Sequence, residues 1–495
     1  MESVYEPYFD PDFDSLIERM YPPRVCIDND TRQDCTLVKV DSANKNGILL
    51  EMVQVLTELD LLISKSYISS DGGWFMDVFH VTDQLGHKLT DQSLIRYIQQ
   101  ALGAERRGGK ASQVETCLGR IVRAKPVSST EYTAIEITTM DRPGLLSEIS
   151  AVLANLGCHV VSAVAWTHNC SAACILYVGD EVNGGGPIAD PERVSQVEKQ
   201  LDNVVGASAC QLQQLGETRP VRLASPVGGR TQMERRLHQL MSALDGGDYD
   251  SWCDGMTSSS KDECRGTVRG RTTEVSVDIE SCNEKGYLVL SVRSRDRPNL
   301  LFDTVCSLTD MKYVVFHANV SSKASLAVQE YYIRHLDGCT MDTETEKRRV
   351  TQCLVAAIER RAFHGLRLAI CTRNRGGLLS EITRVFREHG LSVTRAEIGT
   401  RGERVIGYFH VTDVYGNDVD SKTVELVRRE IGGAIVEVQN SPGSGRFNRA
   451  SSFNTTTTTT TNTTSSSNSQ ERPRFSLGNL FWGLARTPFQ QPRLH

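Results

Sequence analysis

The chain has 495 residues, of which 23% are charged, and its formal net charge at pH 7 is −6. This length allows about three or more domains, and the slight acidity excludes a chain-wide field that would attract nucleic acid or an anionic membrane. The apolar runs are far shorter than the roughly 18 residues of a membrane-spanning helix, and the acidic start, MESVYEPYFD, differs from a signal peptide. We therefore expect a soluble, intracellular protein without membrane or nucleic-acid partners. The 14 cysteines form no CxxC pair and no Cys/His cluster at zinc spacing, so we expect neither a metal site nor a cofactor.

We interpret residues 1–23 as an N-terminal segment. The pattern of residues 35–115 predicts a first folded unit, called unit one. This unit begins with an alternating, strand-like run at Cys35–Val40. Its last strand ends in the pentapeptide FHVTD at Phe79–Asp83, and a helix is predicted at Asp91–Leu102.

Residues 131–215 predict unit two, with a first strand at Tyr132–Thr138 and a second helix at Pro191–Val204. Between them the apolar residues change to a helical period, which indicates an amphipathic helix. Residues 216–273 follow as a Gly/Ser-rich, charged linker with one amphipathic helix around Met233–Leu244.

Residues 286–363 and 365–440 predict units three and four. The pentapeptide FHVTD recurs in unit four at Phe409–Asp413, which identifies the units as repeats of one another. From residue 441 to residue 495 the chain is rich in Ser, Thr and Asn, with seven consecutive threonines, and predicts a disordered tail.

All four units carry one motif where the first strand meets the first helix. The copies are Asn44-Lys-Asn-Gly-Ile-Leu49, Asp141-Arg-Pro-Gly-Leu-Leu146, Asp296-Arg-Pro-Asn-Leu-Leu301 and Asn374-Arg-Gly-Gly-Leu-Leu379. The copy in unit two is the most complete, whereas the first lacks both the Asp and the Pro and the third has Asn in place of Gly.

Each unit reads β-α-β-β-α with a closing strand where the chain has room, which is the ferredoxin-like βαββαβ plan. Extra strand-like runs precede units one and three, at Arg24–Asp28 and Glu274–Asp278. A separate closing strand hardly fits between Arg360 and Leu366, so unit three has either lost this strand or is tightly coupled to unit four. We therefore predict an α+β chain of four ferredoxin-like units in two tandem pairs, each pair consisting of an extra strand and two consecutive units.

The DRPGLL motif, the helix after it and the strand SVTRAEI at Ser392–Ile398 resemble the ACT domain, and four such units in a chain of this size resemble the plant ACT-domain-repeat (ACR) proteins. The resemblance covers roughly residues 24–440. It implies ACT domains that pair side by side, within or between chains, and bind a free amino acid at the strand–helix junction without catalytic activity. It also implies a cytoplasmic or nuclear location and a partner protein that receives the signal.

The junction suits such a ligand on physical grounds. A helix N-terminus offers N–H groups and a positive dipole end to a carboxylate, Asp or Asn can accept hydrogen bonds from an ammonium group, and Gly allows close approach to the backbone. The alternative is that Asp141 only caps the helix and Pro143 occupies its first turn. The candidate ligand-binding residues are Asn44, Gly47, Asp141, Arg142, Gly144, Leu145, Asp296, Leu300, Asn374, Gly376, Gly377 and Leu378.

Other functions are less well supported by the sequence. Gly103–Lys110 resembles a phosphate-binding loop but has Ala104 and Ala111 at required positions. Gly407–Val411 resembles an RNA-binding strand but lacks the aromatic stacking platform. The remaining alternative to an amino-acid sensor is a scaffold of ACT domains that binds partner proteins without a ligand.

Overall fold

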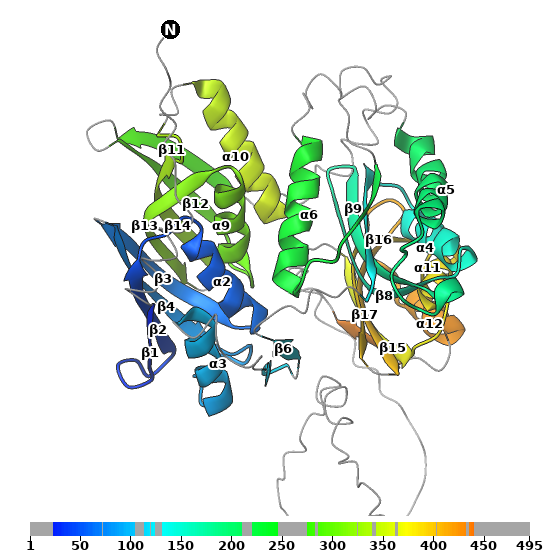
Figure 1. Ribbon diagram of the computed structural model, residues 1–495, viewed down its shortest axis with the longest axis horizontal. Coiled ribbons are helices and arrows are strands. Elements are labelled where there is room, and N and C mark those ends of the chain that lie inside the picture. Colours follow the sequence, from blue (N-terminus) through cyan, green and yellow to red (C-terminus); the bar gives the residue numbers. More distant parts are fainter. Residues whose placement is uncertain are drawn as a thin grey trace, which may run out of the picture.

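The computed structural model describes residues 23–71, 73–103, 113–118, 120–123, 131–209, 220–245, 275–282, 286–323, 325–338, 343–361, 365–401, 403–431 and 435–439. Two eight-stranded antiparallel sheets, each covered on one face by the helices of its own units, form two modules (Figure 1). The predicted disordered tail and nearly all of the N-terminal segment lie outside the described residues. No helix within the described part of the chain is long and apolar enough to cross a membrane.

The first module contains units one and three. Its elements are β1 (Arg24–Asp28), β2 (Thr36–Ala43), α2 (Ile48–Glu58), β3 (Leu62–Asp71), β4 (Trp74–Thr82) and α3 (Gln92–Leu102) from unit one, and β11 (Ser276–Cys282), β12 (Tyr287–Arg295), α9 (Leu300–Asp310), β13 (Tyr313–Lys323), β14 (Leu326–His335) and α10 (Glu344–Glu359) from unit three. The strand order is β1-β2-β4-β3-β13-β14-β12-β11.

The second module contains units two and four. Its elements are β7 (Thr133–Met140), α4 (Leu145–Asn155), β8 (Cys158–His168), β9 (Ser171–Asp180), α5 (Pro191–Ala209) and β10 (Val221–Ala224) from unit two, and β15 (Leu366–Arg373), α11 (Leu378–Glu388), β16 (Leu391–Arg401), β17 (Arg404–Asp413), α12 (Ser421–Ile431) and β18 (Ile435–Gln439) from unit four. The strand order is β10-β7-β9-β8-β16-β17-β15-β18.

The predicted tandem pairing is wrong, because unit one pairs with unit three and unit two pairs with unit four. Strand β3 of unit one lies antiparallel to β13 of unit three, and β8 of unit two lies antiparallel to β16 of unit four. These strands are the open edges of single units, and joining them extends each sheet and removes two exposed edges. The amphipathic helices beside the joined edges, α2 with α9 and α4 with α11, pack against each other across the same boundary.

The closing strands explain the extra runs noticed in the sequence. Strands β1 and β11 precede units one and three and lie antiparallel to the first strands β2 and β12. In units two and four the equivalent edge positions are filled by β10 and β18, which follow the second helix. Unit three therefore has its closing strand, but takes it from the chain before the unit rather than after it.

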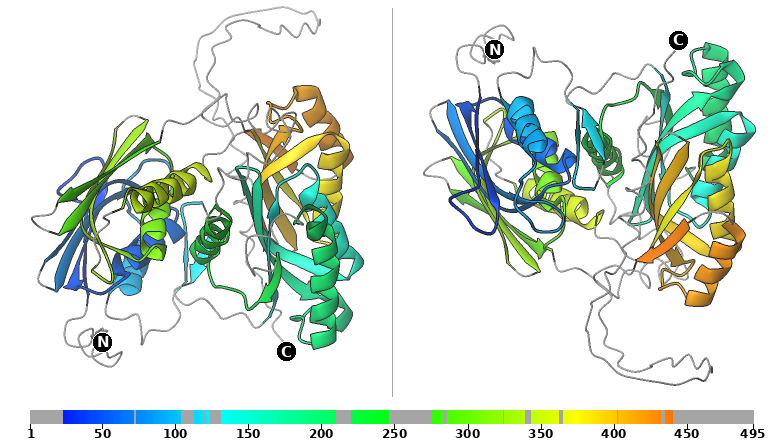
Figure 2. Two further views of the ribbon diagram at one scale, coloured as in Figure 1. Left: turned by 90° about the horizontal axis from the view of Figure 1, so that it is seen from above. Right: turned by 90° about the horizontal axis from the view of Figure 1, so that it is seen from below.

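Helix α6 (Arg230–Asp245), the predicted linker helix, lies between the modules (Figure 2). One side packs on the face of the second sheet that α4, α5, α11 and α12 leave open, and the other side faces α2, α9 and α10 of the first module. The layers therefore run sheet, helices, α6, sheet, helices. A short hairpin, β5 (Gln113–Glu115) with β6 (Ile121–Arg123), and a 3-10 helix, η2 (Glu181–Asn183), complete the described elements.

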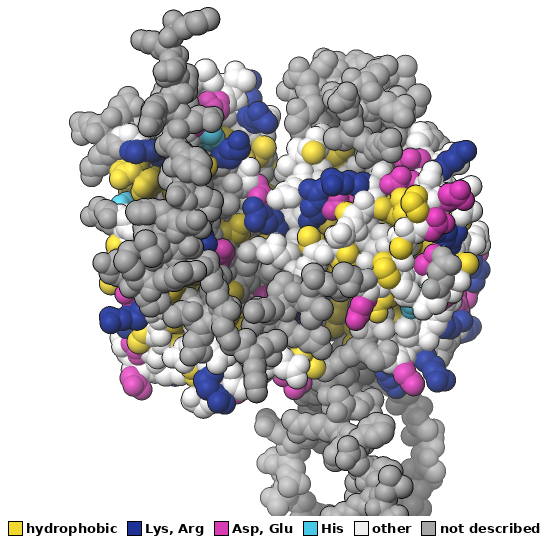
Figure 3. Space-filling model, in the orientation of Figure 1, with side chains coloured by type: hydrophobic (Ala, Val, Ile, Leu, Met, Phe, Trp, Pro, Cys, Tyr) yellow, Lys and Arg dark blue, Asp and Glu magenta, His cyan; other side chains and the backbone are white. Residues whose placement is uncertain are grey.

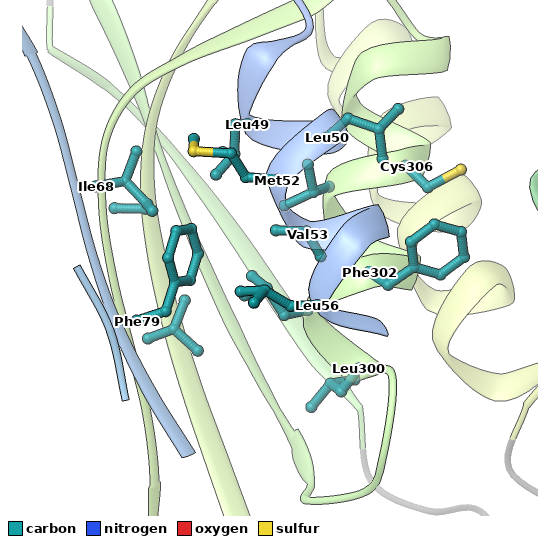
Figure 4. Close-up of a cluster of buried hydrophobic side chains, with 14 of the residues drawn as sticks. Leu49, Leu50, Met52, Val53, Leu56, Ile68, Phe79, Leu300, Phe302 and Cys306 are labelled. Carbon is teal, nitrogen blue, oxygen red and sulfur yellow. The ribbon is translucent and has the colours of Figure 1, made fainter. Parts of the chain in front are cut away.

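Apolar side chains between the sheet and its helices form the core of each module. In the first module Met52, Val53 and Leu56 occupy one face of α2 and are at most 1% exposed, and Phe79 of β4 is completely buried (Figure 4). Full burial of one such side chain contributes roughly 1.5–3 kcal/mol. The helical spacing of the apolar residues therefore fixes which face of α2 meets the sheet.

Candidate functional site

The four motifs form the same backbone turn between the first strand and the first helix. The residue just before each helix has a left-handed conformation, with φ of 82° at Gly47, 82° at Gly144, 63° at Asn299 and 72° at Gly377. Glycine adopts this conformation without strain and Asn tolerates it better than most residues, so Asn299 preserves the turn.

The alternative role of Asp141 as the helix cap is wrong. Helix α4 begins at Leu145 with Gly144 at the cap position, and no side chain among the described residues caps it. The backbone N–H of Asp141 instead donates to the carbonyl of Cys170 at 2.7 Å, which leaves the carboxylate beside an uncapped helix N-terminus.

Arg142 pairs with an acidic residue of the helix that follows the motif. Its Nη1 donates to Oε1 of Glu148 at 2.8 Å, in the first turn of α4. Equivalent pairs join Arg375 to Glu381 in unit four and Arg297 to Asp303 in unit three. The basic residue of the motif therefore braces the turn, and in units two and four it also contributes to the lining of the hollow at its own junction.

A hollow lies at the unit-two junction, where units two and four meet. Asp141, Gly144 and Leu145 line it together with Thr139, and Leu391 of unit four contributes to the wall. Burial raises the pKa of Asp141 to about 6, which makes its carboxylate costly to keep charged without a cation. The hydroxyl oxygen of Thr139 is buried and has no hydrogen-bond partner among the described residues.

A second hollow lies at the unit-four junction on the other side of the same boundary. Asn374, Gly377 and Leu378 line it, and Ser150 and Ala154 of unit two form the opposite wall. The Oδ1 atom of Asn374 is buried, again without a hydrogen-bond partner in the described part of the chain. Such a buried acceptor costs about 1–3 kcal/mol unless something bonds to it.

The two hollows are related by an approximate two-fold axis. The hydroxyls of Ser150 on α4 and Thr383 on α11, equivalent positions of the two units, are hydrogen-bonded at 2.9 Å. Since each hollow takes most of its wall from one unit and the rest from the other, a ligand in either would contact both units. This arrangement suits a ligand whose binding depends on, or alters, the pairing of units two and four.

The two junctions differ in the side chains that lie beside their glycines. A side chain carbon added to Gly144 would lie 2.9 Å from Cδ of Arg387, so the stem of this arginine covers the first junction. At the second junction the residue facing Gly377 is Ala154, and the carboxylate of Glu181 lies beside Gly376. Arg387 thus lies beside the unit-two junction and Glu181 beside the unit-four junction, although neither lines a hollow itself.

The remaining candidates form equivalent turns in the first module, separate from both hollows. They are Asn44 and Gly47 of unit one and Asp296 and Leu300 of unit three.

The third strand of each unit, which lies beneath the junction, also differs between the units, and this feature was missed in the sequence analysis. Cys174 and Gly407 line the two hollows, whereas Asp77 and the fully buried Gln329 occupy the equivalent strand positions of units one and three. Aligning the third strands of the repeats would have identified this difference.

Comparison with known proteins places the chain in a family. The model for the ACR family N-terminal ACT domain matches residues 31–109, and the ACT domain model matches residues 367–432. ACT domain-containing protein ACR1 of Arabidopsis thaliana is 51% identical over 487 residues, which cover 97% of each chain. The chain belongs to the ACR family of ACT domain-containing proteins. Its similarity extends to the ACR3 and ACR2 proteins of the same plant, which are 50% and 47% identical and align with 88% and 89% of this chain and 91% and 90% of their own.

More distant similarities are limited. A bifunctional uridylyltransferase/uridylyl-removing enzyme of Azospirillum brasilense is 37% identical over 81 residues, which cover 16% of this chain and 9% of the enzyme. The aspartate kinase structure from Synechocystis aligns with 82% of this ACR-family chain and 56% of its own, at 13% identity and a TM-score of 0.15, which is too low to support an argument.

Proposed function

We propose that this ACR-family protein is a non-catalytic amino-acid sensor composed of four ACT domains, at residues 35–115, 131–215, 286–363 and 365–440. A free amino acid binds at the boundary between units two and four and alters their pairing. The paired hollows carry this proposal, because each combines an uncapped helix N-terminus, a half-buried carboxylate or amide and apolar walls.

The groups in the unit-two hollow match the parts of an α-amino acid. The carboxylate of Asp141 accepts hydrogen bonds from the ammonium group of the ligand. The positive charge of this group then compensates the cost of ionising the Asp141 side chain. The first-turn N–H groups of α4 face the ligand carboxylate, and the stem of Arg387 lies beside Gly144 at this junction. Leu145, Cys174 and Leu391 surround an apolar side chain. The unit-four hollow offers the neutral Asn374 instead, so we expect weaker or different binding there.

Thermal unfolding with each of the twenty amino acids at millimolar concentration tests this function. A ligand present at about 100 times its dissociation constant adds about 2.7 kcal/mol to the free energy of unfolding. Gly144→Val should abolish the shift, since its side chain would enter the hollow beside Arg387. Gly47→Val is the matched control, because it imposes a side chain at the same φ of 82° in the other module and should preserve the shift.

A ligand-independent scaffold is the second candidate, favoured by the open face of the first sheet. Tyr67, Trp74, Met76, Leu326 and Val328 from neighbouring strands are 38–61% exposed there. Such apolar exposure is typical of protein-interaction surfaces. Absence of a thermal shift with all twenty amino acids, together with an intact fold, would favour this scaffold over the sensor.

The output of the sensor is a changed contact with a partner protein in the cytoplasm or the nucleus. Basic and acidic side chains are intermixed on the face of the molecule in Figure 3, which gives no support to a nucleic-acid partner. Co-purification with and without the amino acid that gives a thermal shift would identify the partner.

A further inference from the structure

Helix α6 packs on β8 and β9, on the face of the second sheet opposite the unit-two hollow. Met233, Leu237 and Met241 of α6 pack on Trp166 of β8 and Ile175 of β9. All five side chains are at most 6% exposed, so α6 belongs to the core of the second module on this side.

The opposite side of α6 reaches a cluster of buried charges in the first module. Asp303 of α9, which is completely buried, contacts Nε2 of His238 on α6 at 2.9 Å and Nη2 of Arg361 at 2.8 Å. Arg361 also contacts Glu234 of α6 at 3.0 Å, and Arg297 contacts Asp303 at 2.7 Å. Burial alone would raise the pKa of Asp303, but Arg361 and Arg297 hold it well below its usual value, so the carboxylate is charged.

Arg297 is the motif arginine of unit three. In units two and four the equivalent arginine and its acidic partner are partly exposed, whereas Arg297 and Asp303 are 15% and 0% exposed. Unit three therefore uses its junction to bind α6 and the second module, which agrees with the loss of glycine at Asn299.

Trp166 joins the apolar and charged sides of α6. Its ring lies 5.0 Å from the guanidinium carbon of Arg361, 5.1 Å from that of Arg395 on β16, and 4.9 Å from the imidazole of His238. Cation–π attraction of this kind strengthens when the groups are desolvated. Its two neighbours in β8, Ala165 and Thr167, line the hollow on the other face of the sheet.

A displacement of β8 at the hollow therefore also moves the indole ring of Trp166, which the charged side chains surround. Buried ion pairs depend strongly on geometry, because their desolvation is offset only by well-aligned partners. Packed interfaces of this kind change between discrete arrangements rather than deforming gradually. The contact between the modules is thus suited to respond to a small shift of one strand.

We propose that occupancy of the hollow at Asp141 is read out at the contact between the two modules, with Trp166 and α6 as the link. This inference rests on the proposed amino-acid binding and adds its regulation. The inter-module cluster, defined as Glu234, His238, Asp303 and Arg361, has one arrangement with the hollow empty and another with it filled. Thermodynamic linkage then requires that weakening the cluster changes amino-acid affinity.

The first experiment uses the full chain with Trp74→Phe, Trp252→Phe and Trp482→Phe, which leaves Trp166 as the single tryptophan of the four in the sequence. Each of the twenty amino acids is added at millimolar concentration and the unfolding midpoint is recorded. Tryptophan emission is recorded beside it for all of them except free tryptophan, whose own fluorescence would mask that of Trp166. An amino acid that raises the midpoint should also shift the emission of Trp166. A raised midpoint with unchanged emission would overturn this coupling but leave the sensor intact, whereas no change in any midpoint would overturn both.

The second experiment measures the dissociation constant of that amino acid for Asp303→Asn. We expect a change of at least about fivefold, the lower end of typical couplings between sites. Lys347→Gln is the matched control, because Lys347 pairs with Glu344 within helix α10 alone, and its affinity should stay within about twofold of the unaltered chain. Where Asp303→Asn does not fold, His238→Gln replaces it. Equal affinities of the cluster variant and the control would refute the link.

Discussion

Replacing Asp141 with Asn should stabilise the unliganded protein at neutral pH and abolish amino-acid binding. Burial raises the pKa of Asp141 from 3.8 to about 6 in the folded chain. The folded state thus binds the proton more tightly than the unfolded state, so the free energy of unfolding falls as pH rises from about 4 to about 6 and the full cost remains above that range.

The size of the effect follows from the shift. One pKa unit corresponds to 1.36 kcal/mol, so a shift of about two units gives at most about 3 kcal/mol. Asn cannot ionise and avoids this cost, but it is a weaker acceptor for the backbone N–H of Arg142, which bonds to the carboxylate. We therefore expect a gain of about 1–3 kcal/mol above pH 6, appearing as a higher unfolding midpoint.

The assay is a series of thermal unfolding curves of the unaltered and Asp141→Asn chains between about pH 4 and pH 8. Their difference is informative because burial also raises the pKa of Asp77, to about 7, and that contribution is common to both. Asn374→Asp is the matched control, since it adds a carboxylate at the equivalent junction and should lower stability as pH rises. The reasoning is refuted if the two curves differ by the same amount at pH 4 and pH 8, or if Asp141→Asn is the less stable chain at pH 8.

Three further predictions concern packing and charge. Arg361→Met should lower the free energy of unfolding by about 3–5 kcal/mol in denaturant titrations, because it removes the cation that the buried carboxylates of Glu234 and Asp303 share; Arg384→Met, at an exposed pair, should cost less than about 1 kcal/mol. Gly407→Ala should lower the free energy of unfolding by about 1–3 kcal/mol in the same measurement and narrow the unit-four hollow. The added carbon would lie 2.7 Å from the ring of Phe409. Ser150→Val combined with Thr383→Val should leave the unfolding midpoint nearly unchanged, because the first module has valines at both equivalent positions, whereas Ser150→Val alone should lower it.

Much of the local structure could be predicted because it depends on neighbouring residues. The alternating run at Tyr132–Thr138 and the helical spacing after Gly144 set the elements β7 and α4. The ferredoxin-like plan and the strand–helix junction as the place of the motif followed from the repeats. Gly144 and Gly377, chosen because glycine permits close approach, prove to have the positive φ that the turn requires.

The spatial pairing of the units could not be predicted from the same signals. Each unit presents a similar apolar helix and a similar open edge, so periodicity allows either neighbouring or alternate units to join. The strands at Arg24–Asp28 and Ser276–Cys282 fill the outer edges of units one and three, and leave β3 and β13 as the edges available for pairing. The difference between the hollows likewise depends on cross-boundary neighbours such as Arg387 at Gly144, which one sequence does not place.

Alternate pairing also explains why the linker helix has so many roles. The chain passes from the first module to the second, back to the first and again to the second, and α6 (Arg230–Asp245) lies on the middle passage. A half-chain ending before α6 would contain units one and two, each without the partner that covers its edge strand, so neither module forms from one half. Because α6 meets the second sheet through apolar residues and the first module through buried charges, the two modules are held by one element that contacts both. A ligand that alters the pairing of units two and four therefore acts on a structure in which the first module is already engaged.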